Sequence, residues 1–332
     1  MLAVAAAGFV YYQLMVVPVV PADAPEAVAI EVPTGSTYEQ VLDSLATHGV
    51  QPNRTFFDPL AERMGYRRPR MRSGRFTLEP GSSAVGVIRK LRSGAQATVD
   101  VVLTTEREPM NVAAKAARFL EPDSLTFLAL FRDTDYLDSL GYSPETLQTL
   151  FVPNTYEMYW NATPRDFMAR MVKEHDRFWR ANDRLAKAKA VGLSPAEVYT
   201  LASIVEKESL AATERPRIAG VYLNRLKRGM PLQADPTAVF ATREFDVGRV
   251  LNRHIEFDSP YNTYRYAGLP PGPITMSSVG SIDAVLQPEE HNYVYFCARG
   301  DGSGEHNFAT TLAGHSRNIA IYVANLRKRG IR

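Results

Sequence analysis

Cysteine is almost absent from this sequence, because Cys297 is the only one among 332 residues. An intrachain disulfide is therefore impossible. The six histidines are scattered, and neither an H-x₃-H spacing nor an HExxH motif occurs, so the sequence predicts no metal site. Residues 30–105 contain no Walker loop, no G-x-G-x-x-G and no C-x-x-C motif, and we expect no cofactor.

Charge of one sign is also scarce, since the formal net charge is only +2. The chain as a whole therefore has no bulk attraction for nucleic acid, and we expect no such partner. Six arginines gather in the stretch RMGYRRPRMRSGR at 63–75. Such a cluster is typical of a solvated face, and an acidic polymer or a lipid headgroup is the alternative partner. With 45% hydrophobic and 22% charged residues, the composition is that of a globular protein of two domains.

Long hydrophobic runs are missing except at the N-terminus. Residues 1–21, MLAVAAAGFVYYQLMVVPVVP, contain no charged side chain. This length is close to the ~20 apolar residues that a helix needs to cross a bilayer. The run has neither the basic start nor the A-x-A site of a cleaved signal peptide, so the sequence predicts a single membrane anchor with the remaining chain extracytoplasmic.

Beyond a Pro/Ala linker at 22–29, residues 30–105 read as a small α/β module. The expected order is strand (30–36), helix (37–50), helix (56–65), strand (74–83), helix (83–94) and strand (97–105). The module carries no catalytic motif, which favours a binding or spacing role. Residues 106–332 hold the polar clusters, and we expect a mixed α+β domain there, so the fold class predicted for the chain is α+β.

The stretch LASIVEKES at 201–209 ends a helix that a capping box at Ser194 and Glu197 predicts to begin at Pro195. At about 100° per residue, Glu208 falls inside the apolar stripe centred on Leu201, and Glu206 falls on the outward face. A carboxyl in the apolar stripe is desolvated, which raises its pKa towards that of a general acid. The alternative for Glu208 is a structural ion pair with a buried arginine, and Glu206 is predicted to be a solvated surface charge.

Several loops add the groups that a sugar-binding groove uses. MPLQADPTAVF (230–240) and DSPYNTYRYAGLPPGPI (258–274) combine prolines with amides, hydroxyls and aromatic rings. The aromatic stretch at 150–164 is equally compatible with sugar binding and with core packing. EHNFATTLAGH (305–315) could be taken for a metal-ligand loop, which its spacing does not favour.

The runs ASIVEKES, LQADPT, SPYNTY, GLPPGPI and HNFATTLAGHSRN, in this order, resemble the endolytic murein transglycosylases of the YceG-like (MltG) family. The resemblance covers nearly the whole chain, and it implies an anchor (1–21), a LysM-like module (30–105) and a catalytic domain (106–332). Its catalytic glutamate corresponds to Glu208. The matching groove residues are Gln233, Asp235, Tyr261 and Asn262. Many relatives have a phenylalanine–proline–aspartate run where this chain has VPNTY, so a carboxylate role at Asn154 is excluded.

The resemblance implies an enzyme of the lyase type at the cell membrane. It would cut nascent peptidoglycan strands between N-acetylmuramic acid (MurNAc) and N-acetylglucosamine (GlcNAc) to leave 1,6-anhydro-MurNAc ends, and so terminate strand elongation beside peptidoglycan synthases. Two alternatives remain at this point. One is a non-catalytic peptidoglycan-binding protein, and the other is a glycan hydrolase, which would usually need two flanking carboxylates.

Overall fold

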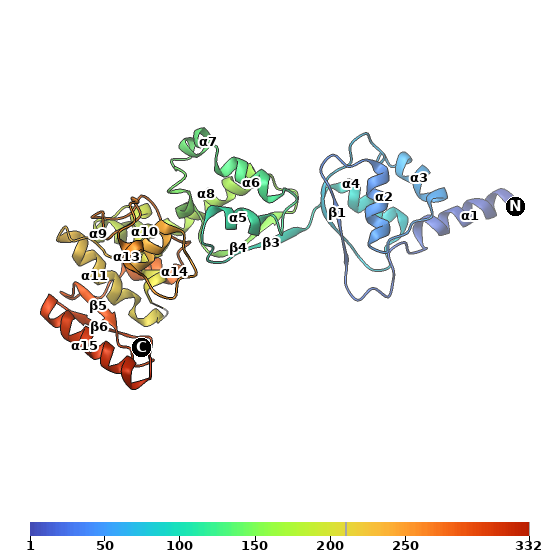
Figure 1. Cartoon of the computed structure of the whole chain (residues 1–332). Helices are drawn as coiled ribbons and strands as arrows, with labels where there is room; N and C mark the ends of the chain where they lie inside the picture. The colour runs from blue at the N-terminus through green and yellow to red at the C-terminus, as the bar shows by residue number, and fades with distance from the viewer. Residues whose placement is uncertain (210, 332) are drawn as a thin grey trace. The chain divides into compact units, whose positions relative to one another are not determined.

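The computed structural model describes residues 1–209 and 211–331, which form two compact units of α+β type (Figure 1). The N-terminal unit contains residues 1–101, 116–124 and 155–167. The C-terminal unit contains residues 102–115, 125–154 and 168–332. Helices predominate, and the strands of the described residues form three two-stranded sheets, β1-β2, β3-β4 and β5-β6. The assignment of 30–105 as a LysM-like module and 106–332 as a catalytic domain stays a prediction.

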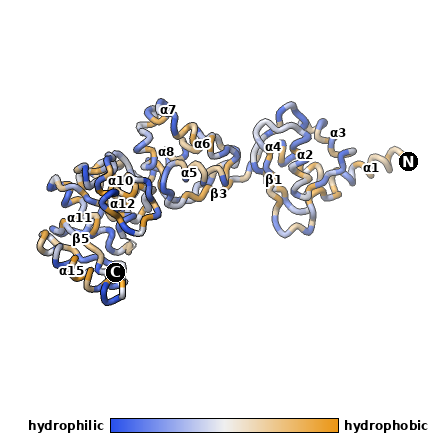
Figure 2. The backbone as a smooth tube through the Cα atoms, viewed as in Figure 1, coloured by the Kyte–Doolittle hydropathy of each residue, from blue (hydrophilic) through white to orange (hydrophobic). Residues whose placement is uncertain are grey.

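The expected membrane-spanning helix at 1–21 is wrong. Helix α1 (Leu2–Met15) has 14 residues, which is about 21 Å at ~1.5 Å per residue, against the ~30 Å of a bilayer core. Across the described residues, no helix has both the length and the apolar character that a membrane crossing requires. Helix α1 is apolar along most of its length (Figure 2).

The rest of the apolar run turns back towards the N-terminal unit, and its last valines join the core of that unit. Pro18 forms an isolated β-bridge with Ser83, and the N–H groups of Val19 and Val20 donate to the Ser82 carbonyl. Val20 is fully buried. The helix is therefore shorter than the apolar run, because a proline prevents it from continuing and the valines after the proline pack into the core.

The order predicted for residues 30–105 is confirmed. The elements are β1 (Val28–Val32), α2 (Tyr38–Thr47), α3 (Arg54–Arg63), β2 (Gly74–Leu78), α4 (Ala84–Ser93) and β3 (Thr98–Leu103). Strands β1 and β2 pair antiparallel with Ile30 opposite Phe76, and both side chains lie in the core. A capping box at Thr37 and Gln40 begins α2, and Gly94 ends α4 in the left-handed conformation that glycine adopts without strain. Five of the six clustered arginines are exposed on this unit.

The remaining elements are mostly helical. They are α5 (Pro109–Ala116), α6 (Ser124–Phe131), α7 (Thr134–Ser139), β4 (Asn154–Tyr159), α8 (Pro164–Arg180), α9 (Arg184–Val191), α10 (Pro195–Glu208), α11 (Arg215–Lys227), α12 (Asp235–Thr242), α13 (Asn252–Ile255), α14 (Val279–Leu286), β5 (Tyr295–Ala298), β6 (His306–Ala309) and α15 (Leu312–Lys328). Short 3₁₀ turns lie at Leu147–Leu150, Ala181–Asp183 and Ala212–Glu214.

Helix α10 is the centre of the C-terminal unit. The predicted capping box at Ser194 and Glu197 is present, with Pro195 at the first helical position. All eight residues from 198 to 205 are buried, because α9, α11, α12 and α14 pack around the helix. The hairpin of β5 and β6 is covered by α15 at the C-terminal end (Figure 1, red). Glu208 is the last residue of this central helix and follows directly on its buried segment.

Candidate active site

Glu208 is the last residue of α10, and its carboxyl is held by a neighbouring helix. The Tyr222 hydroxyl on α11 donates to Glu208 Oε1 at 2.5 Å. Tyr222 is itself 1% exposed, and its ring packs edge-on against Phe296 with centroids 5.8 Å apart. The alternative of a direct ion pair is not found, since neither Arg215 nor Arg225 forms a salt bridge with Glu208 in the described structure.

The surroundings of Glu208 favour its protonated form. Desolvation by burial raises the pKa of Glu208 to about 7, and the charge of Asp235 adds to this effect. The Tyr222 hydrogen bond and the charge of Arg225 oppose it without cancelling it. Near neutral pH the side chain can therefore give up a proton as an acid and take one back as a base.

Two pockets meet at Glu208 and Asp235, and we call them together the Glu208 groove. The first has a volume of about 590 Å³ and is lined on its other walls by the 232–233 turn, Tyr264, the β5-β6 hairpin and α15. The second has a volume of about 300 Å³ and extends towards Arg107, Lys207 and the aromatic pair Phe240 and Phe245. The Glu208 carboxyl thus has open space on both sides.

The turn that carries Gln233 and Asp235 is locked to the 258–266 loop. Gln233 has a left-handed backbone with φ +50°, which is strained for a residue with a side chain. Its N–H donates to the Thr263 carbonyl, and the next N–H, of Ala234, donates to the Thr263 hydroxyl. Asp235 accepts the Tyr264 hydroxyl at 2.5 Å. Gln233 and Asp235, which the sequence predicts to bind substrate, both line the Glu208 groove, and that role stays a prediction.

Tyr261 and Asn262 lie behind this wall and line neither pocket. The Tyr261 ring packs on Phe240 with centroids 4.8 Å apart. Asn262 is fully buried, and its amide nitrogen donates to the carbonyls of residues 254, 255 and 257. The structure thus brings Gln233 and Asp235 to Glu208, whereas Tyr261 and Asn262 hold the loop that supports them.

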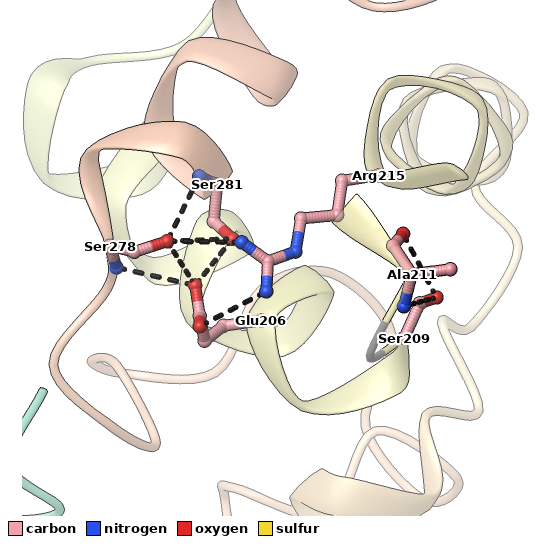
Figure 3. Close-up of polar contacts among 6 residues, drawn as sticks. All are labelled: Glu206, Ser209, Ala211, Arg215, Ser278 and Ser281. Carbon is pink, nitrogen blue, oxygen red and sulfur yellow. Dashed lines mark hydrogen bonds and ion pairs between the residues drawn. The ribbon is translucent and has the colours of Figure 1, made fainter. Parts of the chain in front are cut away.

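Glu206 is not the solvated charge that the helical wheel predicts (Figure 3). Its side chain is 16% exposed, and Oε1 pairs with Arg215 at 3.3 Å. Oε2 accepts from the Ser278 N–H, from the Ser278 hydroxyl and from the Ser281 hydroxyl at the start of α14. Burial raises its pKa, but these hydrogen bonds and Arg215 outweigh burial, so the pKa of Glu206 is lowered. Glu206 therefore joins α10 to α11 and α14.

Sequence reasoning missed Tyr222 and the contribution of His306 and His315 to the groove. Tyr222 lies in an apolar helical run, and nothing in the pattern marks it as the partner of Glu208. The two histidines come from the HNFATTLAGH block, where repeated histidines were the available signal.

The stretch 150–164 lines neither pocket of the groove, and Asn161 instead bonds Ser73 within the N-terminal unit. In residues 1–209 and 211–331, no cluster of His, Cys, Asp and Glu is arranged to hold a metal ion.

The sequence profile of the YceG-like family matches residues 30–321. The chain belongs to the YceG-like family. A relative named endolytic murein transglycosylase from Bacillus subtilis (strain 168) is 29% identical to this YceG-like chain over 334 residues, covering 96% of this chain and 91% of the relative. A relative of the same name from Streptococcus pneumoniae (serotype 2, strain D39) is 27% identical over 350 residues, covering 96% of this chain and 63% of the relative. The crystal structure of a putative YceG-like protein from Listeria monocytogenes has a TM-score of 0.57 and 27% identity, covering 89% of this chain and 99% of that one.

Proposed function

We propose that this chain is an endolytic murein transglycosylase that cleaves peptidoglycan strands between MurNAc and GlcNAc and leaves 1,6-anhydro-MurNAc ends. One observation carries the proposal, namely a carboxyl with a pKa of about 7 at the junction of two pockets. The names of the Bacillus and Streptococcus relatives support the substrate and the reaction.

The proposed reaction uses Glu208 twice. Protonated Glu208 donates its proton to the glycosidic oxygen while the bond from that oxygen to MurNAc C1 breaks and an oxocarbenium-like centre develops. The MurNAc C6 hydroxyl attacks C1, and the Glu208 carboxylate accepts the hydroxyl proton. The acid is regenerated, no water is consumed, and Tyr222 keeps the carboxyl oriented through both steps.

Gln233 and Asp235 are proposed to bind the strand on either side of the cut. Asp235 lines both pockets, and Gln233 lines the larger one. Their amide and carboxylate oxygens can accept from sugar hydroxyls and acetamido N–H groups. Tyr261 and Asn262 are proposed to act on binding only through the loop that fixes this turn.

A glycan hydrolase is the second candidate, because the groove contains a second carboxylate, Asp235. The sequence left Glu206 as the only other nearby carboxylate, but the structure places Asp235 beside Glu208 and commits Glu206 to α14. Asp235 could then activate a water as a second carboxylate. Its hydrogen bond from Tyr264 instead favours a binding role, since that hydroxyl occupies one of its acceptor oxygens.

The substrate of the proposed reaction places the enzyme's site of action at the cell wall. Synthases that extend the same strands are the partners we would expect, because cleavage of a nascent strand ends its elongation. The N-terminal unit would then bind or space the strand relative to the Glu208 groove.

Mass spectrometry of purified glycan strands treated with the whole chain tests the proposal. Products with 1,6-anhydro ends, one water lighter than hydrolytic products, are expected. Reducing ends would identify the hydrolase. Glycan binding without any cleavage, unchanged by Glu208→Gln, would identify a binding protein.

A further inference from the structure

We infer that His306 is a substrate-binding residue of the Glu208 groove that accepts a hydrogen bond from an O–H or N–H of the glycan through Nε2. The inference rests on the proposed function and adds a specific subsite to it. His306 lies at the start of β6 and lines the larger pocket together with Glu208.

A buried carboxylate fixes both the position and the proton of this imidazole. Glu214 Oε1 accepts the His306 backbone N–H at 3.1 Å, and Glu214 Oε2 lies 2.8 Å from His306 Nδ1. The Glu214 side chain is 7% exposed. Because a carboxylate offers only acceptor sites, Nδ1 carries a proton, and in the neutral form of the ring Nε2 is left with a lone pair.

Nε2 faces accessible space. Within the described chain, the His306 ring has no hydrogen bond other than the one to Glu214, and Nε2 is not among the buried polar atoms that lack a partner. The side chain keeps 11% of its surface exposed. An imidazole held by a carboxylate with its other nitrogen open to a pocket is a preorganised acceptor.

The neighbouring rings place this acceptor beside a sugar-binding surface. Phe296 packs edge-on to His306 at 5.4 Å between centroids and also lines the pocket. Phe296 in turn packs on Tyr222, the partner of Glu208. One aromatic ring thus separates His306 from the Tyr222–Glu208 pair. This spacing favours a subsite beside the scissile bond over a role in proton transfer at that bond.

Two variants separate this role from a structural one. His306→Asn keeps a donor near the position of Nδ1, and so the link to Glu214, but removes Nε2. Glu214→Gln acts differently. The backbone N–H of His306 needs an acceptor, so the amide oxygen of the new glutamine turns towards it, and the amide NH₂ group then faces Nδ1 of His306. The ring proton moves to Nε2, and the acceptor in the pocket becomes a donor.

Each variant of the whole chain is expected to raise KM for purified glycan strands roughly 2- to 10-fold, the size of one net hydrogen bond, with kcat nearly unchanged. In the Glu208→Gln background, which allows binding without turnover, Kd measured by calorimetry should rise by the same factor. His291→Asn is the matched control, since His291 makes comparable hydrogen bonds but lines a different pocket.

An unchanged KM and Kd in His306→Asn, or an equal rise in His291→Asn, would overturn the inference while leaving the proposed function intact. A fall in kcat with unchanged KM would also overturn it. Absence of anhydro products from the wild-type chain would instead remove the proposed function. If His306→Asn fails to fold, the same KM and Kd measurements on Glu214→Gln decide the inference.

Discussion

At the scale of single residues, the proposed function assigns the chemistry of the groove to Glu208. Glu208→Gln preserves shape and the capacity to bond Tyr222 but removes the transferable proton. Anhydro-product formation should therefore fall by ~10²–10⁴-fold, the usual contribution of general acid–base catalysis. Quantified product release measures this, with Kd for glycan as the control, because binding should survive. Near-normal turnover would contradict the assignment.

The raised pKa of Glu208 also sets two pH dependences. The acid form is lost as pH rises through about 7, so kcat should fall above that value.

The stability of the fold should depend on pH in the same direction. Because the folded-state pKa of Glu208 lies above the ordinary value near 4.5, its contribution to stability is fully present below pH 4.5 and is lost as pH rises through about 7. Glu208→Gln should therefore match wild type in Tm at low pH and exceed it above pH 7. Calorimetric scans across this range measure the crossover, and a constant Tm difference would argue against a buried, titrating Glu208.

Glu206 should act on stability, in contrast to its sequence interpretation. Glu206→Gln leaves one acceptor oxygen for the Ser278 and Ser281 donors and removes the charge that Arg215 faces. A loss of ~2–3 kcal/mol of unfolding free energy is expected, as for other partly buried ion pairs with hydrogen bonds. Urea denaturation measures it. The pKa of Glu206 is lowered in the folded state, so its contribution to the free energy of unfolding is present above its ordinary pKa and is lost as pH falls through the folded-state pKa. The stabilities of the variant and the wild type should therefore become equal in acid.

At the scale of elements, the 258–266 loop determines whether the Gln233 turn keeps its strained shape. Asn262→Ala deprives the carbonyls of residues 254, 255 and 257 of their amide donor, which should cost about 2–3 kcal/mol and raise KM, because Thr263 no longer holds Gln233. Tyr261→Phe is the control, since its contact with Phe240 is made by the ring. Denaturation and steady-state kinetics measure both effects. An Asn262→Ala protein with wild-type KM would show that the turn is held by other contacts.

Local signals predicted the elements well. The spacing of apolar residues predicted α2, Gly94 marked the end of α4, and the capping box at Ser194 and Glu197 marked the start of α10. None of these signals depends on knowing the fold. The helical wheel correctly placed Glu208 on a desolvated face but predicted Glu206 to be solvated, because a wheel assumes one solvent face and α10 is packed on nearly every side. Tyr222, His306 and Glu214 come from separate elements. Their meeting depends on tertiary packing, which neither spacing nor composition encodes.

At the scale of the whole molecule, the N-terminal apolar run is shared between an exposed helix and a packed core. Val20→Ala should destabilise the N-terminal unit by about 1–3 kcal/mol, because the side chain is fully buried. Val16→Ala is the matched control, as Val16 is 54% exposed and should change little. Amide hydrogen exchange in β1 and β2 measures the stability of the N-terminal unit separately from that of the C-terminal unit. Equal protection in both variants would show that the 17–20 segment does not stabilise the unit.

The one cysteine of the chain lies on the wall of the Glu208 groove. Cys297 is a residue of β5, lines the larger pocket and has a pKa raised by burial, so its thiol reacts slowly but has no competitor elsewhere in the sequence. A fluorophore, spin label or cross-linker directed at thiols would therefore attach at one known point, within the space that the proposed function assigns to a glycan strand. The unaltered sequence already provides a single-site handle for following how the groove fills and empties.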